Sequence, residues 1–84
     1  MSFWLSAAAK DLREKAERKP VHVAAGANLD QSTVWRFEHR GTFPRDVDAL
    51  IAAYADDLEI DAIDIWNLAL KLWRADEDKR HASA

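Results

Sequence analysis

The spacing of apolar residues along this chain predicts helices. In the first segment they recur every three or four residues, which places them on one face of a helix over residues 3–18. These residues are Leu5, Ala8, Ala9, Leu12 and Ala16. A run with the same spacing predicts a helix over residues 45–56. It consists of Val47, Leu50, Ile51 and Tyr54.

Between these two segments, a helix breaker and a turn residue predict a short helix. Pro20 ends the first helix and suits the first turn of the next, because its missing N–H costs nothing there. The short helix is expected over residues 21–27. Asn28 follows it and tolerates the left-handed backbone that a sharp turn needs.

A further helix is expected over residues 31–39. Asp30 is its expected N-cap and Gly41 its end. Val34 and Phe37 are three residues apart and are expected to face the core. The other side of this helix carries Gln31, Ser32, Trp35, Arg36 and His39.

The last predicted helix, over residues 62–74, has more apolar residues than one face can hold. One stripe is Ile60, Ile63, Trp66, Leu70 and Trp73, and another side carries Ile65, Leu68 and Leu72. A small domain buries one such stripe, so the surplus indicates a partner surface. We expect Ile63, Trp66, Leu70 and Trp73 to form a homodimer interface. The alternative is that the helix wraps over the first helix and buries both sides within one copy. Residues 76–84 are expected to be a flexible polar tail.

Residues 20–40 combine the requirements of a helix-turn-helix. Ala24 is small where the second helix would cross it, and Leu29 and Val34 fill the angle between the helices. Residues 8–61 resemble the helix-turn-helix domain shared by lambda-repressor-like phage repressors, Cro proteins and XRE regulators. The resemblance is carried by Val23-Ala24, Asn28-Leu29-Asp30, the run from Gln31 to Glu38, and then Gly41 and Pro44.

The resemblance implies an all-α, five-helix domain over residues 1–75. It also implies a sequence-specific regulator of transcription, a phage repressor or Cro-like protein. Helix 31–39 would enter the major groove of a double-stranded operator, and a homodimer would read a palindrome. Three positions depart from the family pattern: Asn28 replaces the turn glycine, Pro20 replaces a phosphate-binding glutamine, and Trp35 replaces a small residue.

Four side chains are the expected base contacts: Gln31, Ser32, Trp35 and Arg36. Glutamine can bond bidentately to adenine and arginine to guanine. Ser32 can donate to a base or a phosphate, and Trp35 can pack on a thymine methyl. Gln31 and Ser32 are also ordinary first-turn residues, Arg36 could pair with an acidic side chain instead, and Trp35 could belong to the core.

Five residues are the expected phosphate contacts: Lys19, His22, Thr33, Arg40 and Arg45. For Thr33 the alternative is a bond to the backbone of its own helix turn. His22 and His39 could instead be plain surface residues. Glu38 is expected to be a structural partner, for instance of a basic residue in the first helix.

The charge is divided unevenly along the chain. The net charge is −3, but residues 1–45 carry eight Lys or Arg against five Asp or Glu, whereas residues 46–84 carry four against ten. A basic face beside an acidic body favours one docking orientation on phosphate. The alternative is ordinary scatter of surface charge.

Other chemistry finds little support in the sequence. There is no Cys, no Gly-rich phosphate loop, no HExxH motif and no Ser/His/Asp arrangement, so we expect no enzyme, catalytic residue, metal site or cofactor. No secretory signal or membrane-spanning stretch is recognisable, and a cytoplasmic location is expected. The competing function is a protein-interaction module, such as an antirepressor, antitoxin or inhibitor, that binds a partner through the last helix.

Overall fold

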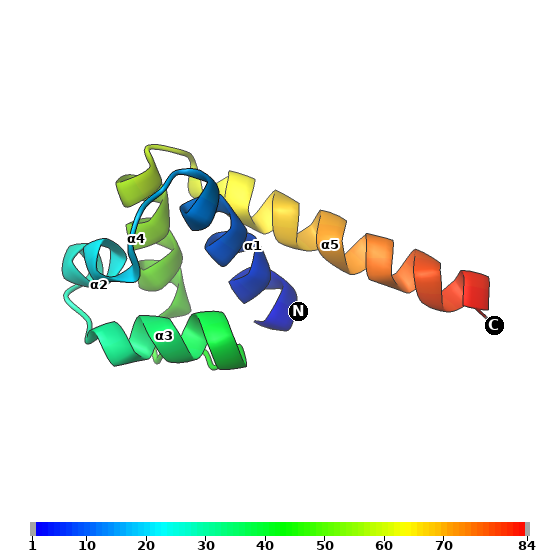
Figure 1. The fold of residues 1–84 in the computed structure, drawn as a ribbon, viewed down its shortest axis with the longest axis horizontal. Coiled ribbons are helices and arrows are strands. Elements are labelled where there is room, and N and C mark those ends of the chain that lie inside the picture. The colour runs from blue at the N-terminus through cyan, green and yellow to red at the C-terminus, as the bar shows by residue number, and fades with distance from the viewer. Residues whose placement is uncertain (1, 84) are drawn as a thin grey trace.

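Five helices joined by short connections form residues 2–83, which are the residues that this computed structural model describes, with side chains for 3–80 (Figure 1). They are α1 (Ser2–Lys15), α2 (Pro20–Ala27), α3 (Gln31–Arg40), α4 (Val47–Leu58) and α5 (Ala62–Ser83). Residues 2–83 contain no strand, and the predicted all-α class is confirmed.

Local hydrogen bonds set helix ends that differ from the prediction. α1 ends at Lys15 instead of residue 18, because Glu17 takes a left-handed backbone (φ 57°) and the N–H of Arg18 bonds the Arg13 carbonyl at 3.1 Å. α4 begins at Val47, two residues later than predicted. The Asp46 carboxylate accepts the N–H of Ala49 at 3.0 Å and so caps the helix there.

The turn between α2 and α3 follows the prediction in its backbone. Asn28 has φ 55° and ψ 42°, so its predicted left-handed conformation is confirmed. Asp30 stands at the N-cap of α3, but its side chain makes no capping hydrogen bond. Gly41 ends α3 at φ 66°. A Cβ there would lie 3.6 Å from the Cα of Phe3, an ordinary contact, so the backbone angle is what favours glycine.

The core lies among all five helices. Its largest fully buried side chains are Tyr54, Phe37, Leu5, Leu50, Ile51, Ile65, Val23 and Val34. Each such side chain stabilises the fold by about 1.5–3 kcal/mol through burial. The predicted stripes of α1 and α4 are confirmed except at Ala16, which is exposed because α1 has already ended.

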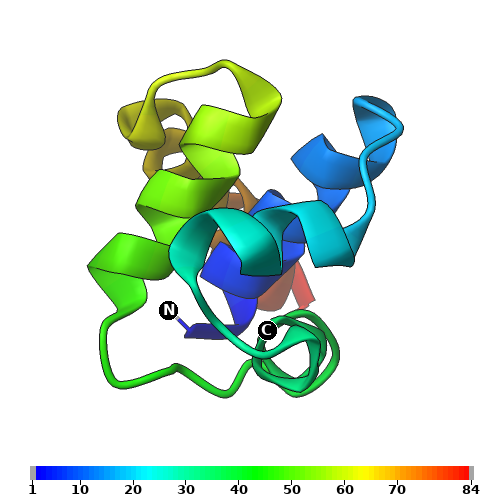
Figure 2. The ribbon, with the colours of Figure 1, turned by 90° about the vertical axis from the view of Figure 1, so that its left-hand side faces the viewer.

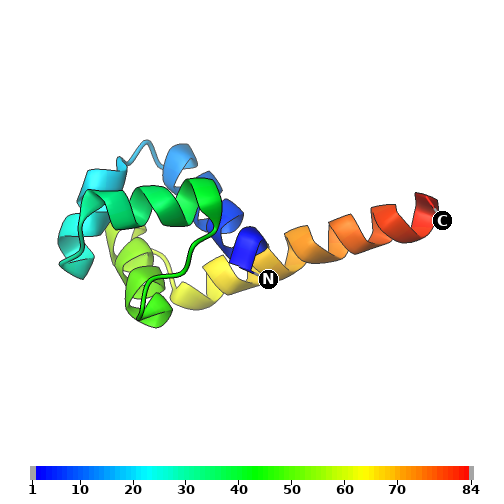
Figure 3. The ribbon, with the colours of Figure 1, turned by 90° about the horizontal axis from the view of Figure 1, so that it is seen from below.

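α5 packs on α1 and then extends beyond the rest of the molecule (Figures 1 and 3). Ile65 and Ala69 are fully buried. The helix continues to Ser83, so the prediction of a helix that ends at residue 74 is wrong, and residues 76–83 of the predicted polar tail are helical. Both glycines and both prolines precede residue 45, so no breaker stops the helix. Asp76 also pairs with Arg80 at 3.0 Å, one turn later. Residue 84 lies outside the described residues.

Candidate nucleic-acid interface

α3 lies on an outer side of the molecule with one face free. Figure 2 views this helix nearly along its axis, below α2, and Figure 3 shows it in front of α1 and α2. Val34 and Phe37 are fully buried and Glu38 is 7% exposed. The outward side chains are Gln31, Ser32, Trp35, Arg36, His39 and Arg40. The predicted division of this helix into two faces is confirmed, and Trp35, 46% exposed, is not a core residue.

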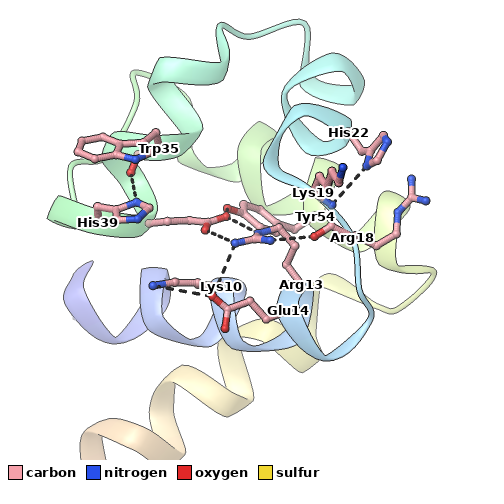
Figure 4. A network of polar contacts seen from close by, with 10 residues as sticks. Lys10, Arg13, Glu14, Arg18, Lys19, His22, Trp35, His39 and Tyr54 are labelled. Atoms are coloured by element: carbon pink, nitrogen blue, oxygen red, sulfur yellow. Dashed lines mark hydrogen bonds and ion pairs between the residues drawn. The ribbon is translucent and has the colours of Figure 1, made fainter.

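A buried polar network fixes the inner face of α3 to two other helices (Figure 4). Arg13 of α1 donates from Nε and Nη2 to the two carboxylate oxygens of Glu38, at 2.8 and 2.7 Å. The Tyr54 hydroxyl of α4 donates to the same carboxylate at 2.6 Å. The third Arg13 nitrogen, Nη1, donates to the Arg18 carbonyl at 2.8 Å. The prediction that Glu38 partners a basic residue of the first helix is confirmed.

The network also shifts the pKa values of Arg13 and Tyr54. The hydrogen bonds from Arg13 to Glu38 raise the pKa of the guanidinium, which therefore stays charged. Burial, followed by the hydrogen bond to Glu38, raises the pKa of Tyr54, which therefore stays a neutral donor. The Glu38 side chain accepts three hydrogen bonds from within the protein, and these bonds tie α3 to α1 and α4.

Ser32 and Arg36 bond to each other along the outer face of α3. Arg36 donates from Nε to the Ser32 carbonyl at 3.3 Å and from Nη2 to the Ser32 hydroxyl at 3.4 Å. The alternative considered for Arg36 was a pairing with an acidic side chain, and among the described residues Arg36 makes no such contact. Both bonds are long and solvent-exposed, so they are weak and can be exchanged for a stronger acceptor.

Trp35 forms an aromatic stack one turn further along. Its ring lies 4.5 Å from that of His39 at an interplanar angle of 13°. The Arg40 guanidinium carbon lies 5.5 Å from the centroid of the indole, within cation–π range. The exposed indole therefore contacts two residues of its own helix.

A shallow cavity of about 290 Å³ lies between α3 and the loop that follows it. It is lined by Leu29, Thr33, Arg36, Thr42, Phe43, Pro44 and Arg45. The loop thus brings together Arg45, Thr33 and Arg36, which the sequence places up to twelve residues apart. Two guanidinium groups and two hydroxyls can bind an anion such as phosphate.

Lys19 and His22 lie together at the start of α2. The backbone N–H of Lys19 donates to Nδ1 of His22 at 3.3 Å, so the imidazole caps this helix end (Figure 4). Both side chains are exposed. The helix N-terminus adds positive potential here, which favours an anion.

The predicted dimer residues on α5 divide between two environments. Trp66 is half-buried and packs against the core, and Leu70 is half-buried. Ile63 is 58% exposed and Trp73 38% exposed. The other apolar side, around Ile65, is the one that the domain buries, so the alternative in which both sides are buried within one copy is wrong.

Sequence reasoning did not identify two of the residues that position α3. Arg13 stands beside the apolar stripe of α1, at a position that a helix turns towards its neighbours. Tyr54 was predicted as core, and a buried tyrosine hydroxyl needs a partner. The third member of the network, Glu38, was predicted as a structural partner of a basic residue in the first helix.

Two further properties concern the described part of the chain. Among its side chains, no three His, Asp or Glu groups lie where they could hold a metal ion. None of the helices within residues 2–83 combines the length and apolar character needed to cross a membrane.

No protein-family model matches the sequence, and neither curated proteins nor solved structures gave a significant match.

Proposed function

We propose that this protein is a sequence-specific, double-stranded DNA-binding regulator of transcription that places α3 in the major groove. The observation that carries the proposal is the construction of α3. Its outer face offers Gln31, Ser32 and Arg36 to solvent, while its inner face is anchored through Glu38 to α1 and α4. Readout of bases needs side chains with free donors and acceptors on a support that does not move.

The connection between α2 and α3 supports a helix-turn-helix. Ala24, where a crossing helix requires a small residue, is 3% exposed. Asn28 supplies the left-handed turn and Val34 is fully buried between the helices. These are the features on which the resemblance to phage repressors, Cro proteins and XRE regulators rests.

The residue roles follow from this docking. Gln31 and Arg36 read base edges, with Arg36 exchanging its two weak bonds to Ser32 for a guanine or a phosphate. Trp35 offers its exposed ring to a thymine methyl. Phosphates on the two sides of the groove are bound by residues at the start of α2, on α3 itself and in the loop that follows it. They are Lys19, His22, Thr33, Arg40 and Arg45.

A homodimer is part of the proposal, because α5 leaves Ile63 and Trp73 exposed beside the half-buried Leu70. Trp73→Ala should shift the equilibrium towards monomer in sedimentation experiments over a range of concentrations. Trp35→Ala is the matched control, since it removes a comparably exposed indole from another helix. Identical sedimentation of Trp73→Ala and wild type would refute this interface.

The same exposed residues of α5 favour one alternative, a protein-interaction module that uses this helix to bind another protein. The two functions place the essential residues on different helices. Substitution of Gln31 and Arg36 would abolish DNA binding and leave an α5 partner bound. Substitution of Ile63 and Trp73 would release that partner.

The proposal is tested by selection of bound sequences from a random duplex library, followed by affinity measurements against salt concentration. A recurrent motif, with affinity that falls steeply as salt rises, is the expected result. The Gln31→Ala, Arg36→Ala double variant should lose about 1–3 kcal/mol for each bidentate base contact. Lys15→Ala removes the same single positive charge from an exposed site on α1 and should retain the motif. No enrichment of any sequence would refute the proposal.

A further inference from the structure

The aromatic stack at the C-terminal end of α3 leaves one ring nitrogen of His39 unaccounted for. Nδ1 of His39 lies 3.0 Å from the carbonyl oxygen of Trp35 (Figure 4). A carbonyl can only accept, so we assign the proton of the neutral ring to Nδ1. Nε2 is then a lone-pair acceptor in the neutral ring and a donor in the imidazolium. His39 is exposed, and its ring is held parallel to the indole.

The spacing of residues along α3 indicates where Nε2 of His39 would lie relative to a bound duplex. His39 follows Ser32 by seven residues, which is about two helical turns, so both side chains lie on nearly the same face about 10 Å apart along the axis. The major groove is about 12 Å wide. If Ser32 lies at the base edges, His39 reaches the wall of the groove, where phosphates are exposed.

The charged groups near His39 belong to α3 and to the helices packed on it. On α3 itself, Arg36 precedes His39 by three residues, and Arg40 follows it with its guanidinium carbon 5.5 Å from the centroid of the Trp35 ring. α1 and α2 also pack on α3. α1 presents Lys10 below His39 in Figure 4, and α2 has His22 as its single titratable residue. The nearest acid, Glu38, is buried and bonded to Arg13. A phosphate of a bound duplex would place a negative charge beside the ring, and an opposite charge favours the imidazolium.

We propose that His39 is a further DNA contact, which takes up a proton from solvent when a duplex binds and donates Nε2–H to a backbone phosphate. Trp35 is a positioning residue for this contact: its ring and its carbonyl fix the plane of the imidazole and direct Nε2 outwards. The inference rests on the proposed function and adds to it, because it makes affinity depend on pH through one residue. Binding then becomes tighter as pH falls through the range in which histidine ionises.

The test uses the duplex recovered by selection, with affinity measured at pH 8.0 and pH 5.5 over a range of salt concentrations. The wild-type protein should bind about tenfold more tightly at pH 5.5, as one added charge-assisted hydrogen bond implies. Its plot of log affinity against log salt should be steeper by about 0.9 at the lower pH, the value for one more neutralised phosphate. Both responses should vanish in His39→Gln.

His81→Gln is the comparison, because residue 81 belongs to the C-terminal end of α5 and has no part in the proposed interface. This variant should keep both responses. A pH response that survives in His39→Gln, or that is lost in His81→Gln instead, overturns the inference. So does a wild-type affinity that does not change with pH. Absence of any bound duplex at either pH refutes the proposed function itself, and circular dichroism at both pH values verifies that each variant is folded.

Discussion

Removal of the Glu38 carboxylate is the sharpest test of what holds α3 in place. In Glu38→Ala, Arg13 loses two hydrogen bonds of 2.8 and 2.7 Å and Tyr54 loses one of 2.6 Å, while both remain buried. Breaking a buried ion pair by removing one partner costs about 3–5 kcal/mol. The lower end applies here, because Arg13 keeps the Arg18 carbonyl at 2.8 Å and has Glu14 at 3.9 Å.

A loss of about 3 kcal/mol is large for this chain. A domain of 84 residues has a total stability of roughly 4–12 kcal/mol. The variant should therefore melt about 12–24 °C below wild type, or have a much lower urea midpoint. Tryptophan fluorescence and circular dichroism should report one coincident transition if unfolding is two-state.

Two controls separate the buried charge from other effects of the substitution. Glu14→Ala removes a carboxylate near the same arginine, but its side chain is 56% exposed, so the change should stay within about 0.5 kcal/mol. A triple variant with Arg13→Met, Glu38→Leu and Tyr54→Phe replaces the whole network by apolar groups of similar size. It should be close to wild type in stability, because no buried side-chain polar group of the network is left without a partner and the Arg18 carbonyl, which loses its bond to Arg13, is only partly buried.

The reasoning is refuted if Glu38→Ala loses less than about 1 kcal/mol, the size of an exposed pair. It is also refuted if the triple variant is as unstable as the single one. In that case the cost would come from packing volume and not from an uncompensated guanidinium.

Three other changes test separate parts of the fold. Ala24→Leu should destabilise by about 1–3 kcal/mol in urea unfolding, because Ala24 is 3% exposed and has no room for a larger side chain; an unchanged midpoint would contradict the close crossing of α2 and α3. Gly41→Ala should cost about 1–2 kcal/mol through its φ of 66°, and a thermal melt equal to wild type would show that the C-cap relaxes. The hydrogen bonds from Arg18, at 2.7 and 3.1 Å, lower the pKa of Asp57. The stabilisation by this pair is therefore complete above the ordinary aspartate range near pH 3.9 and is lost as pH falls through the lowered pKa, so Asp57→Asn should flatten the acid limb of a stability–pH curve.

The candidate site could be predicted in part. The exposed face of α3 follows from the period of its apolar residues. Val34 and Phe37 lie on the side that faces the core, so the opposite side must face solvent. The cavity that joins Arg36 to Arg45 did not follow, because it depends on the path of the Thr42–Arg45 loop, which has no periodic pattern. The stack of Trp35 on His39 has the i, i+4 spacing of a helical pair. Its geometry, however, depends on which rotamers the exposed face allows.

The sequence by itself determined where the helices lie along the chain, the inner faces of α1, α3 and α4, and the turn at Asn28. These are local properties: a period of 3.6 residues, a proline that cannot donate and an asparagine that tolerates positive φ. The tertiary structure alone decided which distant groups meet. Glu38 accepts hydrogen bonds from Arg13, 25 residues away in the sequence, and from Tyr54, 16 residues away. Arg18 donates to Asp57, which lies 39 residues further along the chain. It also decided which apolar side of α5 is buried, because two sides were available and the packing of α1 and α4 on α5 buries Ile65 instead of Ile63. The spacing of apolar residues specifies that one face of a helix is buried. Which neighbouring helix buries that face is decided only when the helices pack together.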